Sequence, residues 1–404
     1  MRQFCRSLSV RSMVRSRWYS ESSSIACHGF REYFRRKHRL EYALNQSTFY
    51  NIHSSGYHST RPNLQTRLCP LMAPPFFTVG IPTYNRESFI RFTLDAILAQ
   101  SFTDYELLIH DNASTDGTRD LVASYRDPRI RYFRHETNVG PAENFASVAR
   151  EARGRYVVIN QDDDLLHRDF LRRCHDAVAG RDDIAMYAAP AWREERGRGY
   201  MARLLRSNEG YDHRYLLQDE IMYMDGPRMA TSLLNLTYYF LHPSIAMRTD
   251  LLRAAGGYST RGDSLHDILT EARMLTRGNL AYDSRPGAMY RDHDGNEWKA
   301  YPRDLRKRLM AGTLHAIVAE LEKAGIVWRP LLDEEFKGYS RNDLERAVRE
   351  WAWCGAPAAL VRRGVVALRA LHRGPAWKFT LRLARKLGWR AFWLSQGKEE
   401  EMQP

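Results

Sequence analysis

The stretch FFTVGIPTYNR at residues 76–86 begins a regular alternation of short apolar segments with segments of helical spacing. Its apolar run predicts a buried strand that ends at Pro82. The same pattern predicts four further strands, at 105–111, 130–135, 155–160 and 184–190. It also predicts four helices, at 88–100, after the turn that follows the second strand to about Tyr125, at 141–152 and at 167–179. Strands that alternate with helices through short loops indicate a mainly parallel, doubly wound α/β sheet.

After Pro190 the alternation becomes weaker. Residues 192–228 are charged and contain glycines, which indicates a long surface excursion. Order is expected again from residue 239, with helices to about 255 and across 264–276 and short strands near 279–283 and 287–291. Beyond Tyr301 the pattern is helical throughout. We therefore divide the chain at residues 190 and 300, into 76–190, 191–300 and a helical, basic C-terminal region at 301–404.

The first 71 residues carry most of the net charge. The chain of 404 residues has a formal net charge of +13, and residues 1–71 hold twelve Lys or Arg against three acids, so about +9 lies there. The remaining charge is ordinary for a protein of this length. The basic composition is therefore weak evidence for a nucleic-acid partner, and we expect none.

Segment 1–71 has no sustained helical or strand period, and three interpretations stay open. Its Arg- and Ser-rich composition suits an organellar presequence, or a basic arm that binds an anionic surface. It is also consistent with a segment outside the folded protein, because Met72-Ala73-Pro74-Pro75 would make a natural start before the first strand. We treat 1–71 as a disordered extension and begin the folded domain at residue 72.

Cysteine usage and hydropathy indicate a cytoplasmic protein. The five cysteines are odd in number, widely scattered and without a CxxC pair, which argues against a disulfide framework or a zinc site. No stretch approaches about 18 uninterrupted apolar residues, so no membrane-spanning helix is expected. Arg11 and Arg15 interrupt any apolar core of a secretory signal.

Four polar clusters follow four of the predicted strands. PTYNR (82–86) follows the first strand, DNASTDGT (111–118) the second, HETNVG (135–140) the third and QDDD (161–164) the fourth. In an open parallel sheet, ligands bind outside the carboxyl ends of the strands. The shared placement predicts that these clusters form one binding site.

The acidic triplet Asp162-Asp163-Asp164 draws its significance from this context, because three consecutive acids are close to a chance event in a chain with 48 acids. Carboxylates fixed at a strand end can hold Mg²⁺ or Mn²⁺ and leave coordination positions for diphosphate oxygens. Such a cation would neutralise charge on a nucleoside-diphosphate leaving group. The alternative is that Asp164 only caps the next helix.

The two clusters after the first and second strands allow both a functional and a structural interpretation. Asp111, at a strand tip, could accept a hydrogen bond from a base or a ribose, and the ring of Tyr84 could stack on a base. The alternative for DNASTDGT is a plain turn in which Thr115 or Asp116 caps the next helix.

The motifs FFTVGIPTYNR, YELLIHDNASTDGT, NVGPAENF and GRYVVINQDDDLL, in this order and spacing, resemble the start of the family 2 inverting glycosyltransferases, which have the GT-A fold. The resemblance covers 76–185 and extends more loosely over 239–296. Asn138, Gly140, Asn144 and Phe145, together with the triplet, are similar to enzymes that add sugars to bacterial surface polysaccharides. The resemblance implies a GT-A nucleotide-diphospho-sugar transferase fold over 72–300 with a helical C-terminal extension.

The resemblance also implies individual roles. A first group would bind the nucleotide-sugar donor, namely Pro82, Thr83, Tyr84, Asn85, Asp111, Asn112, Asn138, Asp162 and Asp163. A second group would bind the metal, namely Asp162, Asp164 and His293, with Asp164 the most direct ligand. Asn112 stands where many members have a second acid, which puts donor-base discrimination in doubt. Gln161 stands where the family often has Asp, which leaves the register of the motif open by one position.

The catalytic base is assigned by the same resemblance. Inverting transfer needs a carboxylate that takes the proton of the acceptor hydroxyl, and family members place it on a helix after a Gly-Gly-aromatic turn. Here Gly256-Gly257-Tyr258 precedes Asp267, with Glu271 as the fallback one helical turn later. His266 replaces the usual Glu. The alternatives are that Asp267 only complements the helix dipole and that His293 is structural. His242 is expected on the acceptor side.

The C-terminal segment 357–396 contains Lys and Arg but no acid. Its helical stripe of five basic residues, Lys378, Arg382, Arg385, Lys386 and Arg390, lies beside apolar residues that include Trp377. A basic amphipathic helix of this kind can lie on an anionic membrane. The alternative is ordinary helices packed on the catalytic domain.

Together these observations predict an inverting glycosyltransferase that uses a nucleotide-sugar donor, expected to be UDP-linked, with Mg²⁺ or Mn²⁺. The expected acceptor is a glycan or a lipid-linked glycan at the cytoplasmic face of the membrane. A nucleotidyltransferase is disfavoured, because PTYNR lacks a Gly-rich phosphate loop. The remaining alternative is a sugar-nucleotide-binding or nucleic-acid-binding protein with an inactive GT-A domain.

Overall fold

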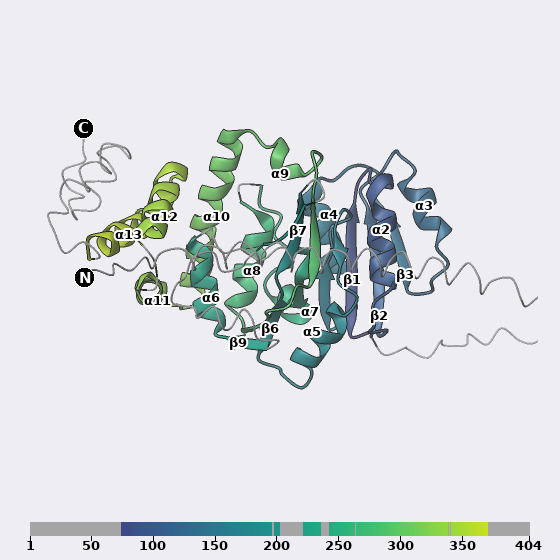
Figure 1. Ribbon diagram of the computed structural model, residues 1–404, viewed down its shortest axis with the longest axis horizontal. Helices are drawn as coiled ribbons and strands as arrows, with labels where there is room; N and C mark the ends of the chain where they lie inside the picture. Colours follow the sequence, from purple (N-terminus) through teal and green to yellow (C-terminus); the bar gives the residue numbers. More distant parts are fainter. Residues whose placement is uncertain are drawn as a thin grey trace, which may run out of the picture. The chain divides into compact units, whose positions relative to one another are not determined.

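The central element of the computed structural model is an eight-stranded sheet in the order β3-β2-β1-β4-β10-β6-β11-β9 (Figure 1). Its strands are β1 (Phe77–Thr83), β2 (Tyr105–Asp111), β3 (Ile130–Arg134), β4 (Tyr156–Ile159), β6 (Ile184–Ala188), β9 (Ile221–Met224), β10 (Ile245–Arg248) and β11 (Asn279–Asp283). The structure describes residues 74–195, 198–202, 221–235, 242–262, 264–337, 339 and 341–370. Of these, all but 198–200 belong to one compact unit.

The sheet is mostly parallel, as predicted. β1 pairs in parallel with β2 and β4, β2 with β3, and β6 with β11. β10 is antiparallel to both β4 and β6, and β9 is antiparallel to β11. The insertion of β10 between the fourth and fifth predicted strands was not predicted, because its four residues carry no local signal of the neighbours with which they pair.

Helices cover both faces of the sheet. On one face lie α2 (Glu87–Leu98), α3 (Thr118–Ser124) and α5 (Phe170–Val178). On the other face lie α4 (Pro141–Glu151), α6 (Gly226–Ser232), α7 (Thr249–Ala254) and α8 (His266–Leu275). Side chains of a strand alternate between faces, so Leu107 and Ile109 of β2 belong to the first core and Leu108 to the second. Gly80 lets α4 approach β1, because a Cβ there would lie 2.1 Å from Val148 Cγ1.

A second, smaller sheet has the order β5-β12-β7-β8. Its strands are β5 (Leu165–Leu166), β7 (Ala191–Glu195), β8 (Arg198–Ala202) and β12 (Ala288–Asp292). The prediction of one surface excursion over 192–228 was therefore wrong at its two ends. The reason is that β7 pairs with β12, about a hundred residues later, and such a pairing leaves no local period in the sequence.

The predicted helical region after Tyr301 is confirmed over the part of it that is described. After the short helix α9 (Glu297–Ala300) come α10 (Arg303–Lys323), α11 (Trp328–Phe336), α12 (Arg341–Cys354) and α13 (Ala358–Ala370). Short 3₁₀ turns stand at Leu233–Asn235 and His242–Ser244. Buried residues of α10 to α13 share one apolar cluster with α6 and α8. They therefore extend the core that covers this face of the large sheet.

Two regions on which predictions rest lie outside the described residues, namely segment 1–71 and the basic stripe between Lys378 and Arg390. Within the described ranges, no helix is both long enough and apolar enough to cross a membrane. Cys174 and Cys354 are buried free thiols.

Replacement of Gly226 by Ala is expected to destabilise the protein. A Cβ at this first residue of α6 would lie 2.0 Å from the carbonyl oxygen of Gly278 and 2.5 Å from that of Leu275. Backbone atoms cannot swing away as a side chain can, so we expect a loss of about 1–3 kcal/mol in the free energy of unfolding, measured by urea denaturation. Gly262→Ala is the control, because nothing lies within 4 Å of a Cβ there. Equal midpoints for both variants would contradict this account.

His110 is expected to make stability depend on pH. Its side chain on β2 is 4% exposed and stacks on Phe133, and burial, with His135 as the second cause, lowers its pKa to about 4. An unfolded histidine titrates near 6.5, so between these values the unfolded state binds more protons. Stability therefore falls as the pH drops from 6.5 towards 4, by about 2 kcal/mol at pH 5 from this residue.

The measurement is the free energy of unfolding at pH 5.0 and 7.5 in three proteins. His110→Phe should lose less stability on acidification than the wild type. His315→Phe, at an exposed position of α10, should keep the slope of the wild type. An unchanged slope in His110→Phe would show that this imidazole does not control the acid sensitivity.

Candidate active site at the carboxyl edge of the sheet

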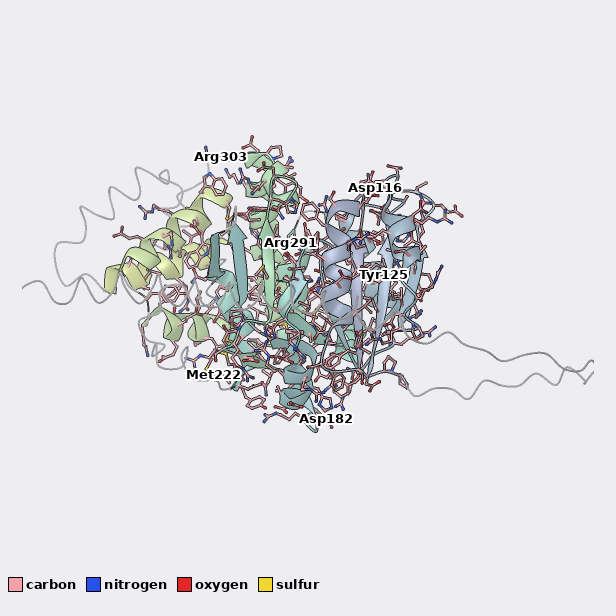
Figure 2. The ribbon with its side chains drawn as sticks, turned by 45° about the vertical axis from the view of Figure 1, so that its right-hand side comes forward. Asp116, Tyr125, Asp182, Met222, Arg291 and Arg303 are labelled. Atoms are coloured by element: carbon pink, nitrogen blue, oxygen red, sulfur yellow. The ribbon has the colours of Figure 1, made fainter. Side chains whose placement is uncertain are left out.

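The carboxyl ends of the first three strands are held level by backbone pairing. Thr83 at the end of β1 is in register with Asp111 at the end of β2, and Asp111 is in register with Arg134 of β3. The pairing continues past the strands, since Asn112 N donates to Thr83 O at 2.9 Å and Asn160 N donates to Gly80 O at 2.9 Å. All four predicted polar clusters therefore lie at one edge of the sheet, where Figure 2 labels Asp116.

Asp162 is fixed by groups from the cluster after β1. Its Oδ2 accepts a hydrogen bond from Tyr84 N, and its Oδ1 lies 3.3 Å from Arg86 Nε. The side chain is largely buried, with 8% of the residue exposed. Burial, and next the carboxylate of Asp163, raise the pKa of Asp162 to about 7, against the lowering effect of Arg86.

Asp164 is fully buried and faces β12. Its Oδ1 accepts from Arg291 N at 2.9 Å, while its Oδ2 has no hydrogen-bond partner among the described residues. Arg291 Nε also donates to the carbonyl oxygen of Asp163. Burial and the neighbouring Asp163 raise the pKa of Asp164. The short strand β5, which follows the triplet, pairs with β12 and so brings Arg291 to this position.

Asp163 is the member of the triplet that meets His293. His293 Nε2 lies 3.0 Å from Asp163 Oδ2, and the imidazole ring stacks on Phe89 of α2 at 4.4 Å between centroids. Gly295 N donates to His293 Nδ1 at 3.1 Å. Because Nδ1 accepts, Nε2 carries the proton and donates to the carboxylate. The structure thus brings His293 to Asp163, and not to the Asp164 that the sequence favoured as the direct ligand.

The carboxylates at this edge are of the kind that Mg²⁺ and Mn²⁺ prefer, and the imidazole of His293 is a ligand better suited to Mn²⁺ than to Mg²⁺. Two observations agree with a cation here, the unpartnered buried Oδ2 of Asp164 in the described part of the chain and the like charges of three adjacent acids. In the same described ranges, however, no three His, Cys, Asp or Glu side chains stand close enough together to hold a metal ion.

Asp111 and its neighbours organise the loops around the site. Asp111 is fully buried, its Oδ1 accepts from Ser114 N at 2.7 Å, and its Oδ2 accepts from the hydroxyl of Tyr132. Asn112 Nδ2 donates to Asn138 Oδ1 at 2.9 Å, which joins the second polar cluster to the third. Asp111 therefore stabilises the loop that follows β2. The amides of Asn112 and Asn138 lie together beside that loop.

The cluster after β1 presents one exposed ring. Pro82 and Thr83 are buried, whereas Tyr84 is 42% exposed. Asn85 adopts a left-handed backbone with φ of 53°, and its Oδ1 accepts from Thr115 N at 2.8 Å. This contact holds the loops after β1 and β2 together and leaves the Tyr84 ring facing outward.

Asp267 lies in the first turn of α8, half-buried, next to a group of histidine and tyrosine side chains. His242 Nε2 lies 2.7 Å from the Tyr258 hydroxyl, and His242 Nδ1 lies 3.8 Å from Glu271 Oε1. Burial lowers the pKa of His242 to about 4, opposed by the charge of Asp267. Glu271 is fully buried. The accessible carboxylate of the two candidate bases is therefore that of Asp267.

Phe145 connects the two parts of the site. Its ring, on α4, lies 5.3–5.8 Å from the rings of His242, Tyr258 and His266. The preceding residue, Asn144, donates to the backbone oxygen of His110 at 3.1 Å. One turn of α4 thus contacts both the end of β2 and the aromatic group around His242.

Sequence reasoning missed several residues that shape this site, namely Arg86, Phe89, Thr93, Tyr258 and Arg291. Thr93 Oγ1 lies 2.8 Å from Asp162 O and 3.0 Å from Asp164 O. Arg86 and Tyr258 carried a signal, because they belong to PTYNR and to the turn Gly256-Gly257-Tyr258, and Arg291 lies two residues before His293. The others are ordinary residues of helices or turns.

Comparison with known proteins finds similarity to glycosyltransferases over part of the chain. Residues 78–251 match the model of glycosyl transferase family 2. The putative teichuronic acid biosynthesis glycosyltransferase TuaG of Bacillus subtilis is 37% identical over 101 residues, which are 24% of this chain and 40% of that protein. The abequosyltransferase RfbV of Salmonella typhimurium is 40% identical over 109 residues, which are 26% of this chain and 33% of that protein. The chain therefore matches less than half of the length of these relatives.

A solved structure extends the likeness of the fold. S. aureus TarS 1–349, in complex with UDP-GlcNAc, superposes with a TM-score of 0.54 at 16% identity, over 80% of this chain and 90% of that one. The mostly parallel sheet and its covering helices agree with the predicted GT-A architecture. Residues 78–251 are thus similar to glycosyl transferase family 2, and the chain has the GT-A fold.

Proposed function

We propose that this protein is a metal-assisted, inverting glycosyltransferase that moves a sugar from a nucleoside-diphosphate sugar to a glycan or lipid-linked acceptor. The observation that carries the proposal is the meeting of a buried acidic triplet, an asparagine pair and an exposed tyrosine at the carboxyl edge of a GT-A sheet. Ligands of open α/β sheets bind at this edge. The UDP-GlcNAc complex of TarS supports a UDP-linked donor.

The donor would lie across the loops after β1, β2 and β4. The outward ring of Tyr84 offers a flat apolar surface for the base. The paired amides of Asn112 and Asn138 offer donors and acceptors to the base or the ribose. Asp111 and Asn85, with Pro82 and Thr83, would shape the pocket through the loops that they hold. Asp162 and Asp163 would stand nearest the diphosphate.

A divalent cation, Mg²⁺ or Mn²⁺, fits the donor set of this edge. We propose that Asp163 and His293 hold it, together with the other predicted ligands, Asp162 and Asp164. When bound, it would neutralise negative charge on the diphosphate leaving group. A metal ligand must be deprotonated, so the cation competes with the proton that His293 Nε2 donates to Asp163.

Asp267 would take the proton of the acceptor hydroxyl as that oxygen attacks the anomeric carbon. Its carboxylate stands in the first turn of α8. His242 and Tyr258, hydrogen-bonded to each other beneath it, would limit the positions that the carboxylate can adopt. Glu271 stays the fallback, although its full burial sets it further from an entering acceptor.

The proposed acceptor is a glycan or a lipid-linked glycan. A lipid-linked acceptor would place the enzyme at the inner face of the cell membrane. The basic stripe from Lys378 to Arg390, which would bind that surface, lies outside the described residues.

Donor binding is expected to need both a cation and Asp163. A panel of nucleotide sugars is titrated by calorimetry in Mn²⁺ and in EDTA. Chelation and Asp163→Asn should each weaken binding at least about tenfold, because each removes a contact that holds the diphosphate. Asp95→Asn on α2, which loses a contact with Tyr125, should bind normally. If no nucleotide sugar binds in Mn²⁺, the proposed function is wrong.

Asp267→Asn is expected to separate binding from chemistry. The variant should keep the donor affinity of the wild type, since Asp267 lies on α8 and not on the donor loops. Transfer, followed as release of the nucleoside diphosphate, should fall by about 10²- to 10⁴-fold with loss of the general base. Glu271→Gln is measured in parallel. Full transfer by Asp267→Asn, with loss in Glu271→Gln, would move the role to Glu271.

A further inference from the structure

A polar pocket lies at the opposite, amino-terminal edge of the sheet. It has a volume of about 340 Å³, and it is lined by residues from the start of β4, the turn before β6 and the junction of β10 with α7, namely Gly154, Arg155, Asp182, Arg248, Thr249, Asp250 and Arg253. Figure 2 places Asp182 at the edge of the molecule away from Asp116. The pocket is thus separate from the acidic site, and its volume falls at the lower end of ligand sites, about 300–1,000 Å³.

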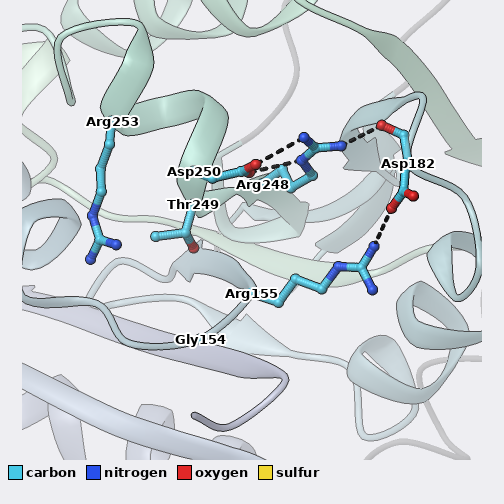
Figure 3. Close-up of a pocket in the computed structure, with 7 residues that line it drawn as sticks. All are labelled: Gly154, Arg155, Asp182, Arg248, Thr249, Asp250 and Arg253. Carbon is cyan, nitrogen blue, oxygen red and sulfur yellow. Dashed lines mark hydrogen bonds and ion pairs between the residues drawn. The ribbon is translucent and has the colours of Figure 1, made fainter.

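Three guanidinium groups from different elements surround this pocket. Figure 3 shows Arg155, Arg248 and Arg253 around Thr249. Arg155 Nη2 pairs with Asp182 Oδ1 at 2.8 Å, and Arg248 forms a two-pronged pair with Asp250 at 2.7 and 2.8 Å. The lining therefore carries three positive charges against two negative ones.

Arg253 and Thr249 hold unused hydrogen-bonding capacity. Arg253 donates from Nη2 to the backbone oxygen of Ala152, and no carboxylate pairs with it in the described part of the chain. A guanidinium has five donors. The Thr249 residue is 3% exposed, and its Oγ1 has no hydrogen-bond partner among the described residues. A buried hydroxyl without a partner is uncommon, and here it lines the cavity.

Of the two carboxylates of the pocket, only that of Asp182 is weakly held. The side chain of Asp182 is 91% exposed and that of Asp250 is 66% exposed. A single-pronged ion pair that faces solvent contributes little, so an incoming anion can displace Asp182 from Arg155, whereas the two-pronged pair of Arg248 with Asp250 stays in place. The same anion would then meet three guanidinium groups, which bind phosphate oxygens in pairs.

We propose that this pocket is a binding site for a phosphate group, either free or in the head group of an anionic lipid. Arg253 and the Thr249 hydroxyl contact the phosphate oxygens directly, and Arg155 and Arg248 complete the positive lining. This inference does not depend on the proposed transferase activity.

The test is titration of the full chain with inorganic phosphate in EDTA, followed by ³¹P NMR at low ionic strength. Arg253→Gln should weaken binding at least about tenfold, since it removes charge-assisted hydrogen bonds. Thr249→Val, of similar volume, should weaken it less but measurably. The matched control is Arg126→Gln, because exposed Arg126 also donates to a backbone oxygen, that of Ala123, but lies elsewhere.

A second arm separates the two sources of phosphate. Co-sedimentation with phosphatidylcholine vesicles that contain phosphatidylglycerol is measured for the wild type, Arg253→Gln and Arg126→Gln. If Arg253→Gln no longer sediments with the vesicles while the wild type and Arg126→Gln still do, the phosphate belongs to a lipid head group. If Arg253→Gln weakens binding of inorganic phosphate but leaves sedimentation with the vesicles unchanged, the phosphate is a free anion. The proposal is overturned if neither probe binds, or if Arg253→Gln binds as the wild type does. Phosphate binding that depends on Asp163 instead would place the anion at the other edge and also overturn it.

Discussion

The burial of three adjacent carboxylates at the end of β4 is the constraint on which the rest of the site depends. Buried charges are costly unless other groups compensate for them, and each aspartate is held by a different part of the chain. Arg86 reaches Asp162, His293 reaches Asp163, and the backbone of Arg291 reaches Asp164. The pairing of β12 with β5 delivers both of the later residues. The second sheet is therefore what makes an acidic loop tolerable at this position.

The same arrangement leaves the charge of the acidic loop only partly compensated. Its compensation is incomplete, since burial and mutual repulsion still raise the pKa of Asp162 and of Asp164. A divalent cation would relieve that repulsion more fully than the arginines do. Phe145 of α4 packs against His242 and Tyr258, which lie near Asp267. Donor loops and the proposed base are therefore connected through one helix, which would keep their spacing fixed.

The two edges of the sheet have opposite character. The carboxyl edge gathers acids from loops that follow parallel strands, whereas the amino-terminal edge gathers arginines around Thr249. The antiparallel strand β10 explains why arginines gather at the amino-terminal edge. It ends at the edge where its neighbours begin, and so it brings Arg248 beside Arg155. One inserted strand thus gives the sheet a cationic pocket at an edge where an all-parallel sheet would have only strand starts.

The sequence alone determined the mostly parallel sheet and the four polar clusters at its edge, because both follow from local period and from the order of strands. The family resemblance also made Asp267 and His293 candidates for the base and for a metal ligand, and these roles stay predictions. Only the tertiary structure decided that His293 meets Asp163, that Asp111 is turned inward and that Arg291 and Thr93 secure the triplet. These contacts join residues up to about 130 positions apart. Such partners are set by the pairing of short strands whose few residues carry no period of their own.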